Sequence, residues 1–459
     1  MTEREAEIIG LVHKEVKPAL GCTEPIAVAL AVAKAVETIR NNCCGSCPKY
    51  DGDLWRLGTG FRIRVEVSGN ILKNGMGVGI PGTGMVGLHI AAALGAVCGK
   101  SEYSLEVLHD LDPASIARAK ELVADGAVDI VMADTDRKLY VKATVEAASH
   151  DGCCPGKDLP GNRHKADAVI MDDHDRIVET VLDSNVLFTR PQEDPATGHG
   201  ERSTLDYHLT VKEIYDFVNN VSYDDISFIL ESRTLNMALA REGLEGSYGL
   251  MVGKTIGNPA NREVFGNEFM SYAMSLTAAA SDARMAGCTL AAMSNSGSGN
   301  QGITVTMPVI AYAKKYQVDD CRLARALMLS HLVAIHIKGY LGKLSALCGC
   351  VIASTGSSCG LVYLRGGAYE QVCSAIKNMI GNITGMVCDG AKVGCALKVA
   401  SGVSCSVQSA LLALSGTCIS EHDGIIEKDI EKTIRNLGRI GSVGMQATDT
   451  MILDIMSCK

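Results

Sequence analysis

The segment Phe61-Arg-Ile-Arg-Val-Glu-Val67 alternates apolar and polar residues along its whole length. A period of two is typical of a strand with one buried face, so these residues predict a half-buried β-strand. Outward from it, the sequence predicts a helix over 112–125 and strands over 128–133 and 139–147. Strand and helix signals mixed in this way favour an α/β domain.

After Asp225 the strand signal nearly disappears and helical periodicity continues to the C-terminus. The sequence therefore predicts an α+β protein with three parts. N-terminal helices occupy 1–54, an α/β domain occupies 55–224, and an all-helical domain occupies 225–459.

The N-terminal part is predicted to contain a helix over 4–17 and a break at Gly21-Cys-Thr-Glu-Pro25. Thr23 is expected to cap the next helix, which continues to about Arg40. We expect these helices to pack on the C-terminal domain. A turn is expected at 41–54.

Two further segments of the α/β domain are less regular. A glycine-rich strand is predicted at 75–80, followed by a Pro81–Gly84 loop and a helix to about Val97. The polar segment from Asp151 to about Ser203 has two strand-like pieces, and we expect the region near 150–205 to be a peripheral insertion.

The chain has 459 residues, 43 lysines and arginines against 52 acidic residues, and a net charge of −9. No basic patch stands out, which argues against nucleic acid or anionic lipid as a partner. The charged N-terminus lacks the apolar core of a signal peptide, so the 18 cysteines are expected to stay reduced in a cytoplasmic protein. Two uncharged stretches, Leu344–Leu364 and Val399–Ser420, are interpreted as buried helices and not as membrane spans, because small polar residues interrupt both.

Three cysteines near the C-terminal end are the main chemical signal: Cys348, Cys388 and Cys395. Thiolates hold iron–sulfur clusters, and a cluster bound by three of them leaves one iron open to a substrate. In one continuous helix, Cys388 and Cys395 would lie about 10 Å apart along the axis. A turn at Asp389-Gly390 would fold them together. The alternative is that all three are buried structural cysteines.

Several longer runs have a specific pattern: Ala19-Leu-Gly-Cys-Thr-Glu-Pro-Ile-Ala27, Lys73-Asn74, Pro81-Gly-Thr-Gly-Met-Val-Gly87, Ser281-Asp-Ala-Arg284, Met293-Ser-Asn-Ser-Gly-Ser-Gly-Asn-Gln-Gly-Ile303, Ser345-Ala-Leu-Cys348 and Cys388-Asp-Gly-Ala. Together these runs resemble the L-cysteine desulfidase family, iron–sulfur lyases that convert L-cysteine into pyruvate, ammonia and sulfide. The C-terminal half is more distantly similar to the alpha part of iron–sulfur L-serine dehydratases. The resemblance covers nearly the whole chain and matches least well at 150–205.

This resemblance implies a 4Fe–4S cluster held by Cys348, Cys388 and Cys395, with the fourth iron meeting the substrate. The serine dehydratase pattern fits Cys350 about as well as Cys348, and the desulfidase motif favours Cys348. Cys359 and Cys405 match neither motif, so core packing is expected for them.

Cys22 is the candidate catalytic base. It lies just before a predicted helix N-terminus, where the helix dipole favours a thiolate. His331 is the rival base, although a histidine in this apolar segment is more often a core residue.

Two glycine-rich loops are candidate substrate-binding elements. The turn 294–302 is dense in backbone N–H groups and amide side chains, a nest that suits an amino-acid carboxylate. The second element is the Gly82-Thr-Gly84 loop, and Lys73 nearby in the α/β domain adds a cation. An interface between domains is the usual place for such groups to meet. The candidate binding residues are Asn70, Lys73, Asn74, Thr83, Asn295, Ser296, Gly297, Ser298, Asn300 and Gln301. The alternative is that both loops are structural turns.

Both loops also match the dinucleotide-binding pattern, at Gly82–Gly87 and Gly297–Gly302. Pro81 before the first match and Pro308 after the second argue against dinucleotide binding.

A second metal site is a further alternative, at Cys43, Cys44, Cys47, Cys153 and Cys154. The role of Cys458 stays open.

The expected function is a cytoplasmic lyase that eliminates sulfide from L-cysteine, with L-serine as the alternative substrate. A dinucleotide-binding oxidoreductase and a non-catalytic iron–sulfur protein are the rival functions. The expected partner is a small amino-acid substrate. Binding to nucleic acid or to a membrane is not expected. The oligomeric state is left open, a homo-oligomer included.

Overall fold

The computed structural model describes residues 1–44, 61–148, 163–190, 204–342 and 345–458. The chain divides into two compact units. The sheet unit comprises Leu20–Gly200, and the helical unit comprises Met1–Ala19 together with Glu201–Lys459. The mixture of helix and sheet confirms the predicted α+β class.

The sheet unit is built on one six-stranded sheet with the order β3-β2-β4-β5-β6-β7. Strands β2 and β3 are parallel, and every other neighbouring pair is antiparallel. The strands are β2 (Arg62–Val67), β3 (Val128–Met132), β4 (Tyr140–Ala148), β5 (Arg163–Met171), β6 (Ile177–Leu182) and β7 (Asn185–Thr189). The alternation at 61–67 is confirmed, since Ile63, Val65 and Val67 are buried.

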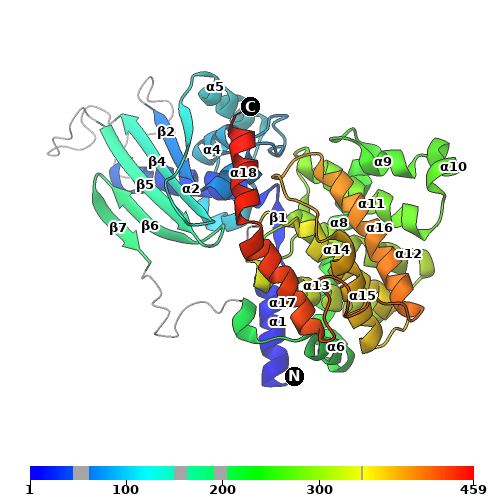
Figure 1. Ribbon diagram of the computed structural model, residues 1–459. Helices are drawn as coiled ribbons and strands as arrows, with labels where there is room; N and C mark the ends of the chain where they lie inside the picture. The colour runs from blue at the N-terminus through cyan, green and yellow to red at the C-terminus, as the bar shows by residue number, and fades with distance from the viewer. Residues whose placement is uncertain (45–60, 149–162, 191–203, 343–344, 459) are drawn as a thin grey trace. The chain divides into compact units, whose positions relative to one another are not determined.

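Helices cover one face of this sheet (Figure 1). They are α2 (Thr23–Ile39), the π-helical turn η1 (Arg40–Cys44), α3 (Gly69–Gly75), α4 (Leu88–Val97), the 3-10 turn η3 (Ser101–Glu106) and α5 (Pro113–Ala124). Helix α2 is buried almost all round because it packs on β4, β5 and α4. A Cβ added at Gly95 would lie 2.3 Å from the Ala29 carbonyl oxygen, so α2 and α4 pack at a distance that only glycine allows.

Helix α2 belongs to the sheet unit, whereas α1 belongs to the helical unit. Two expectations for this unit are wrong. The residue that caps α2 is Cys22, without a side-chain cap bond, in place of Thr23. No strand spans 75–80, where α3 ends and a single bridge joins Gly79 to Val86. Within the predicted insertion, the described residues form β5, β6 and β7 at one edge of the sheet, and β5 pairs along its whole length with β4.

The helical unit begins with α1 (Glu3–Glu15), and the short strand β1 (Pro18–Leu20) pairs with β8 (Ala291–Met293). The remaining elements are η4 (Thr204–Tyr207), α6 (Val211–Asn220), α7 (Tyr223–Ile226), η5 (Ser227–Leu230), α8 (Glu231–Glu245), α9 (Val252–Gly257), η6 (Pro259–Asn261), α10 (Arg262–Phe265), α11 (Phe269–Met285), α12 (Gly299–Tyr316), α13 (Asp320–Leu341), α14 (Gly349–Leu364), α15 (Tyr369–Ile383), α16 (Cys395–Leu414), α17 (Ile430–Arg439), η7 (Ile440–Gly444) and α18 (Gln446–Ser457).

Helix α14 is the central helix of this unit and contacts α12, α13, α15 and α16 (Figure 1). Its small residues make this possible. A Cβ at Gly356 would lie 2.4 Å from the Ser330 carbonyl oxygen of α13, so the two backbones nearly touch. The buried helix expected within Leu344–Leu364 is confirmed over Gly349–Leu364.

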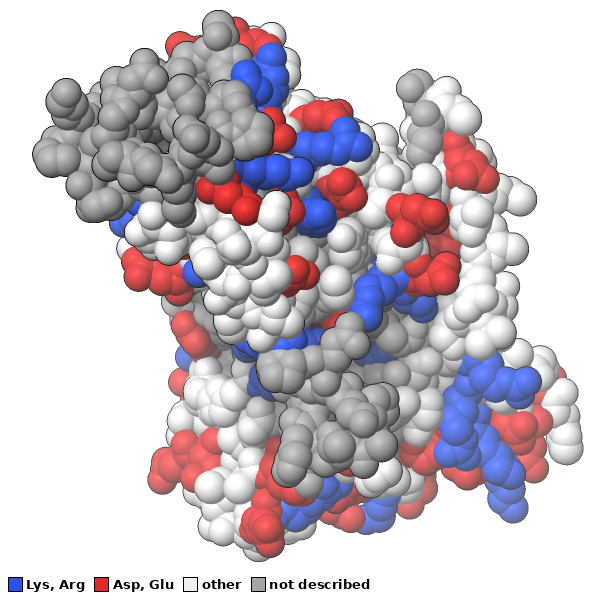
Figure 2. All heavy atoms as spheres, turned by 90° about the vertical axis from the view of Figure 1, so that its left-hand side faces the viewer, with Lys and Arg blue, Asp and Glu red and all other residues white. Residues whose placement is uncertain are grey.

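Among the described residues, α16 is the one helix long and apolar enough to cross a membrane, and half of its most apolar window is buried. It packs on α11, α14 and α15, as a core helix does. On the face of the molecule in Figure 2, basic and acidic side chains are interspersed, without a broad area of one sign.

Candidate active site

Cys348 and Cys388 are brought together by a short antiparallel pairing in the helical unit. Leu347 bridges Val387, the Cys348 N–H donates to the Met386 carbonyl at 3.0 Å, and the Cys388 N–H donates to the Ala346 carbonyl at 2.7 Å. Side chains alternate across such a pairing, so the residues flanking the Leu347–Val387 bridge share one face. Both thiols therefore lie on the same side of this loop pair.

Cys395 joins them through the predicted turn. Gly390 has a φ of +89°, which reverses the chain after Asp389. Helix α16 then begins at Cys395, whose Sγ lies 3.7 Å from the Gly390 carbonyl oxygen. Gly390 thus takes the left-handed conformation expected of a turn, and the residues assigned to a turn follow at Val393 and Gly394.

The ionisation of two of the thiols depends on their surroundings. Burial, together with the charges of Cys388 and Cys395, raises the pKa of Cys348 to about 12. Burial also raises the pKa of Cys395, with Cys388 adding to the effect. At neutral pH Cys348 and Cys395 are thiols, so a bound metal must displace their protons.

Lys398 supplies a positive charge beside the thiols. Its Nζ donates to the Val387 carbonyl at 2.8 Å and pairs with Asp389, which also pairs with Lys392. Burial lowers the pKa of Lys398, but the bond to Asp389 and the charges of Cys348 and Cys388 raise it, and the net result is a raised value. A lysine held in this way offsets the negative charge of thiolates or of an anionic cluster.

Cys350 is turned toward α16. Its Sγ donates to the Lys398 carbonyl at 3.1 Å, and a Cβ at Gly402 would lie 2.5 Å from that sulfur. Because this thiol already has a hydrogen-bond acceptor and a packing partner, the geometry favours Cys348 over Cys350 as the available ligand.

In the part of the chain that the structure describes, no three His, Cys, Asp or Glu side chains are close enough to hold a single metal ion. An iron–sulfur cluster accepts wider spacing, because each thiolate binds a different iron. The three thiols thus fit such a cluster in number, in donor chemistry and in their mutual charge effects, without forming a single-ion site.

Next to the thiols lies a buried network of polar side chains. Asn295 Oδ1 accepts from Ser296 Oγ at 3.0 Å and from Gln301 Nε2 at 2.7 Å. Its Nδ2 therefore faces His331 and donates to Nδ1 at 2.9 Å. Asn295 and His331 are both fully buried.

This network decides the state of His331. Burial lowers the pKa of His331 to about 3, so the ring is neutral at physiological pH. Because Nδ1 accepts a hydrogen bond, the proton of the neutral ring is on Nε2. His331 Nε2 is then a donor, which argues against His331 as the base.

Two buried polar atoms of the network have no hydrogen-bond partner among the described residues: His331 Nε2 and Gln301 Oε1. Such orphaned groups are uncommon and mark sites where a ligand supplies the missing partner. Gln301 Oε1 lies 3.2 Å from the position of a Cβ at Gly349, which Cys348 and Cys350 flank. The network and the cysteine segment are therefore neighbours in one site.

Several N–H groups of the expected nest at 294–302 have acceptors within the protein. The N–H groups of Ser294 and Ser296 donate to the carbonyls of Lys17 and Glu15, and those of Asn295 and Ser298 are also used. Ser298 Oγ caps α12 by accepting from the Gln301 N–H. Ser296 and Gly297 take left-handed backbone conformations that form the turn. The side chains of Asn295, Asn300 and Gln301 are the polar groups of this turn that the buried network uses.

Asp282 and Arg284 belong to the Ser281–Arg284 run and had no predicted role. Arg284 is buried, and its Nη1 donates to Asn300 Oδ1 at 3.3 Å. A Cβ at Gly299 would lie 2.2 Å from Arg284 Nε, so the guanidinium lies against the start of α12. Asp282 and Arg284 are a charged pair in an otherwise uncharged helix, and this pattern in the sequence could have marked them as candidate site residues.

Cys22 belongs to a second polar cluster, in the sheet unit. Its buried Sγ donates to Glu24 Oε2 at 3.0 Å, and Thr23 Oγ1 donates to the same oxygen at 3.2 Å. Asn74 Nδ2 donates to Glu24 Oε1 at 3.0 Å, which ties the predicted Lys73-Asn74 motif to the Cys22 segment. Lys73 is also buried, in the last turn of α3.

Other sequence candidates differ in their surroundings. Thr83 Oγ1 donates to the Ile80 carbonyl at 2.8 Å and accepts from the Met85 N–H at 3.0 Å, so it stabilises its own turn. Asn70 is half-buried near the start of α3. Cys458 is exposed at the end of α18. The second metal site falls outside the described residues at Cys47, Cys153 and Cys154, as do the side chains of Cys43 and Cys44.

Comparison with known proteins matches residues 102–454 to the family described as serine dehydratase alpha chain. The chain belongs to this family. The matched range contains the three thiols and the Asn295–His331 network, and the Cys22 cluster lies before it. As a member of an iron–sulfur serine dehydratase-like family, this chain is an enzyme of the lyase class, and the family association suggests an iron–sulfur cluster.

Three relatives of similar length are each named UPF0597 protein. The one from Oleidesulfovibrio alaskensis is 48% identical over 451 residues, covering 98% of this chain and 97% of the relative. The one from Phocaeicola vulgatus is 48% identical over 459 residues, covering 100% and 98%. A third, from Porphyromonas gingivalis, is 42% identical over 461 residues, covering 100% and 99%.

Proposed function

We propose that this protein is an iron–sulfur lyase that converts L-cysteine and water into pyruvate, ammonia and sulfide. The observation that carries the proposal is the placement of Cys348 and Cys388 on one face of a loop pair, beside the orphaned Gln301 Oε1. L-Serine, with water as the leaving group, is the second candidate substrate, because the family name is that of serine dehydratases.

Cys348, Cys388 and Cys395 would hold the cluster. A bound 4Fe–4S cluster with one iron free of protein supplies a Lewis acid for the atom that leaves Cβ. Lys398 would offset the negative charge that the bound thiolates bring into a buried site.

The polar network would bind the amino acid. His331 Nε2–H can donate to the substrate carboxylate, and Gln301 Oε1 can accept from the substrate ammonium group. Arg284 lies by the same helix start and adds a positive charge. Burial of these groups excludes water, which strengthens each hydrogen bond to the substrate.

We assign removal of the α-proton to the Cys22–Glu24 pair. Their hydrogen bond lets one group pass a proton to the other, so the pair can take up the α-proton at Cys22 Sγ. Loss of the α-proton and of the Cβ substituent gives aminoacrylate, which hydrolyses to pyruvate and ammonia.

The preference for L-cysteine rests on the Ala19–Ala27 and Lys73-Asn74 runs, which resemble cysteine desulfidases. We further propose a cytoplasmic location, with a small amino acid as the partner and no nucleic acid or membrane.

The test is anaerobic purification of the full chain with iron and sulfide analysis, followed by parallel assays of sulfide and pyruvate from each amino acid. We expect brown, iron-containing protein and release of sulfide from L-cysteine. Pyruvate from L-serine alone would transfer the assignment to serine. Iron-containing protein that acts on neither would instead favour a non-catalytic role.

Variants locate the site. Cys348→Ala, Cys388→Ala and Cys395→Ala should each abolish the brown absorbance. Cys350→Ala is the matched control, since it removes a neighbouring buried thiol and should keep the colour. Cys22→Ala should keep the colour and lose activity, and loss of colour in that variant would make Cys22 a ligand.

A further inference from the structure

A hollow of about 440 Å3 lies in the helical unit, away from the thiols. Helices α8, α12 and α13 and the turn after α12 line it. Its floor is apolar, formed by Met237, Ile310, Ala313 and Leu323, all buried. A volume of this size falls in the range of pockets that bind small molecules.

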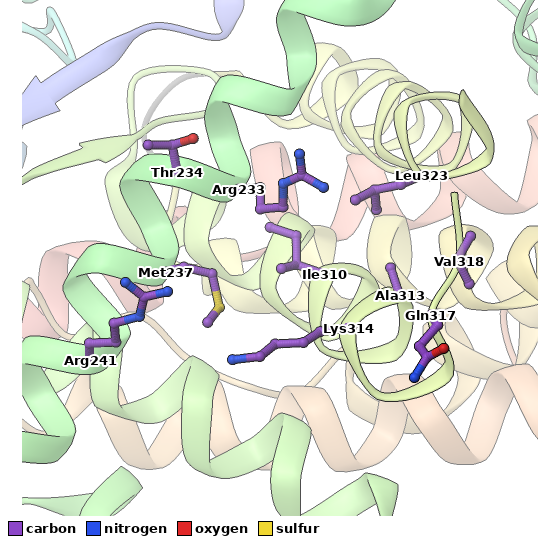
Figure 3. A pocket seen from close by; sticks show the side chains of 10 residues that line it. All are labelled: Arg233, Thr234, Met237, Arg241, Ile310, Ala313, Lys314, Gln317, Val318 and Leu323. Atoms are coloured by element: carbon purple, nitrogen blue, oxygen red, sulfur yellow. The ribbon is translucent and has the colours of Figure 1, made fainter. Parts of the chain in front are cut away.

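Three cations surround this floor: Arg233, Arg241 and Lys314. Figure 3 shows Arg241 and Lys314 extending from different helices toward Met237. Among the described residues, neither Arg241 nor Lys314 has an acidic or hydrogen-bonding partner. Arg233 is held at the rim by Asp320, at 2.6 Å and 3.1 Å.

Two other lysines of the same unit have acidic partners. Lys315, the next residue along α12, lies 3.6 Å from Glu268, and Lys212 pairs with Asp216. Arg241 and Lys314 instead lie together beside one hollow, on a chain with a net charge of −9. Because Asp320 neutralises Arg233, the charges of Arg241 and Lys314 give the hollow a net positive charge.

We propose that this hollow binds a small amphiphilic anion. Its carboxylate or phosphate lies between Arg241 and Lys314, and its apolar body covers Met237, Ile310 and Leu323. Cations beside a buried apolar floor recognise these two chemical features together. A free three-carbon amino acid lacks the apolar body, so the ligand is not the substrate of the lyase.

The hollow is separate from the candidate active site. Gln301 lies in the first turn of α12 and Lys314 in its last, 13 residues later, which is about 20 Å along the helix. The inference therefore does not depend on the proposed function.

Fluorescence titration of the purified full chain tests the proposal. The probe is anilinonaphthalene sulfonate, an aromatic body with one anionic group, and its uncharged analogue phenylnaphthylamine is the control ligand. In the double variant Arg241→Gln, Lys314→Gln, affinity for the sulfonate should fall by about three- to tenfold. Affinity for phenylnaphthylamine should stay unchanged, and added salt should weaken sulfonate binding to the wild type.

Lys315→Gln is the matched control variant, because it removes one charge from the same helix end outside the hollow. Equal sulfonate affinity in the wild type and the double variant would overturn the proposal, as would an equal loss in Lys315→Gln. Displacement of the probe by phenylbutyrate assigns a carboxylate ligand, and displacement by phenyl phosphate assigns a phosphate. Displacement by neither contradicts an anion site.

Discussion

Asp282 provides the sharpest test of the electrostatics near the candidate site. It is fully buried in α11, and its Oδ2 accepts from the Gly253 N–H at 2.9 Å. Burial raises the pKa of Asp282 from 3.8 to about 6, against the opposing effect of backbone N–H groups. A carboxyl whose folded-state pKa is raised stabilises the fold below its unfolded pKa, and this contribution is lost as pH rises through the folded value.

The rise from 3.8 to about 6 corresponds to about 3 kcal/mol at full ionisation. About two-thirds of this contribution to stability is lost between about pH 4.5 and about pH 7.5. Solvent screening reduces the loss over that interval to about 1–2 kcal/mol. Asp282→Asn removes the ionisation, so relative to the wild type the variant should gain this amount of unfolding free energy over that interval. Comparing two pH values cancels any constant change in hydrogen bonding that the amide introduces.

Calorimetry of both proteins at the two pH values measures the effect. The Tm difference, variant minus wild type, should grow by about 2–4 °C from the lower to the higher pH. Asp320→Asn is the control in the same unit, because Arg233 lowers the pKa of Asp320 and its stabilising contribution is lost as pH falls. A Tm difference for Asp282→Asn that is constant or shrinks with rising pH would refute the reasoning.

Other variants test packing and chemistry. Asn295→Ala should destabilise the protein by about 2–5 kcal/mol in urea unfolding, because it leaves buried groups of Gln301 and His331 unpaired; a change below about 0.5 kcal/mol would contradict the network. Gly95→Ala should cost about 1–3 kcal/mol by forcing α2 and α4 apart. Its control, Gly10→Ala in the exposed face of α1, should stabilise by about 0.5–1 kcal/mol. Glu24→Gln should keep the brown colour and lower activity, since an amide cannot take the Cys22 proton; unchanged activity would remove Glu24 from the mechanism.

Several parts of the candidate site could be predicted because their cause is local. The turn at Asp389-Gly390 needs only a glycine at a positive φ, and the helix that begins at Cys395 follows from it. Cys22 at a helix start was predictable from Pro25 in the first turn of α2. The individual thiols and the amide-rich turn were therefore visible in the sequence as residue types in a pattern.

The partners of these residues were not visible, because they come from distant segments. Asn295 and His331 are 36 positions apart, and only the packing of α12 and α13 brings them within 2.9 Å. That contact decides the tautomer of His331 and turns a candidate base into a donor. The choice of Cys348 over Cys350 likewise depends on α16, whose Lys398 carbonyl and Gly402 occupy one thiol and not the other.

By itself, the sequence determined the elements with strong periodicity, such as the strand at 62–67 and the helix at 113–124, and the chemistry of the cysteine segment. Tertiary structure alone decided that β5 joins β4 in the sheet and that α2 packs beneath that sheet. The reason is physical. Alternation and turn residues act through a residue's immediate neighbours, whereas strand pairing and the burial of a helix on all sides depend on surfaces supplied by residues far away in the chain.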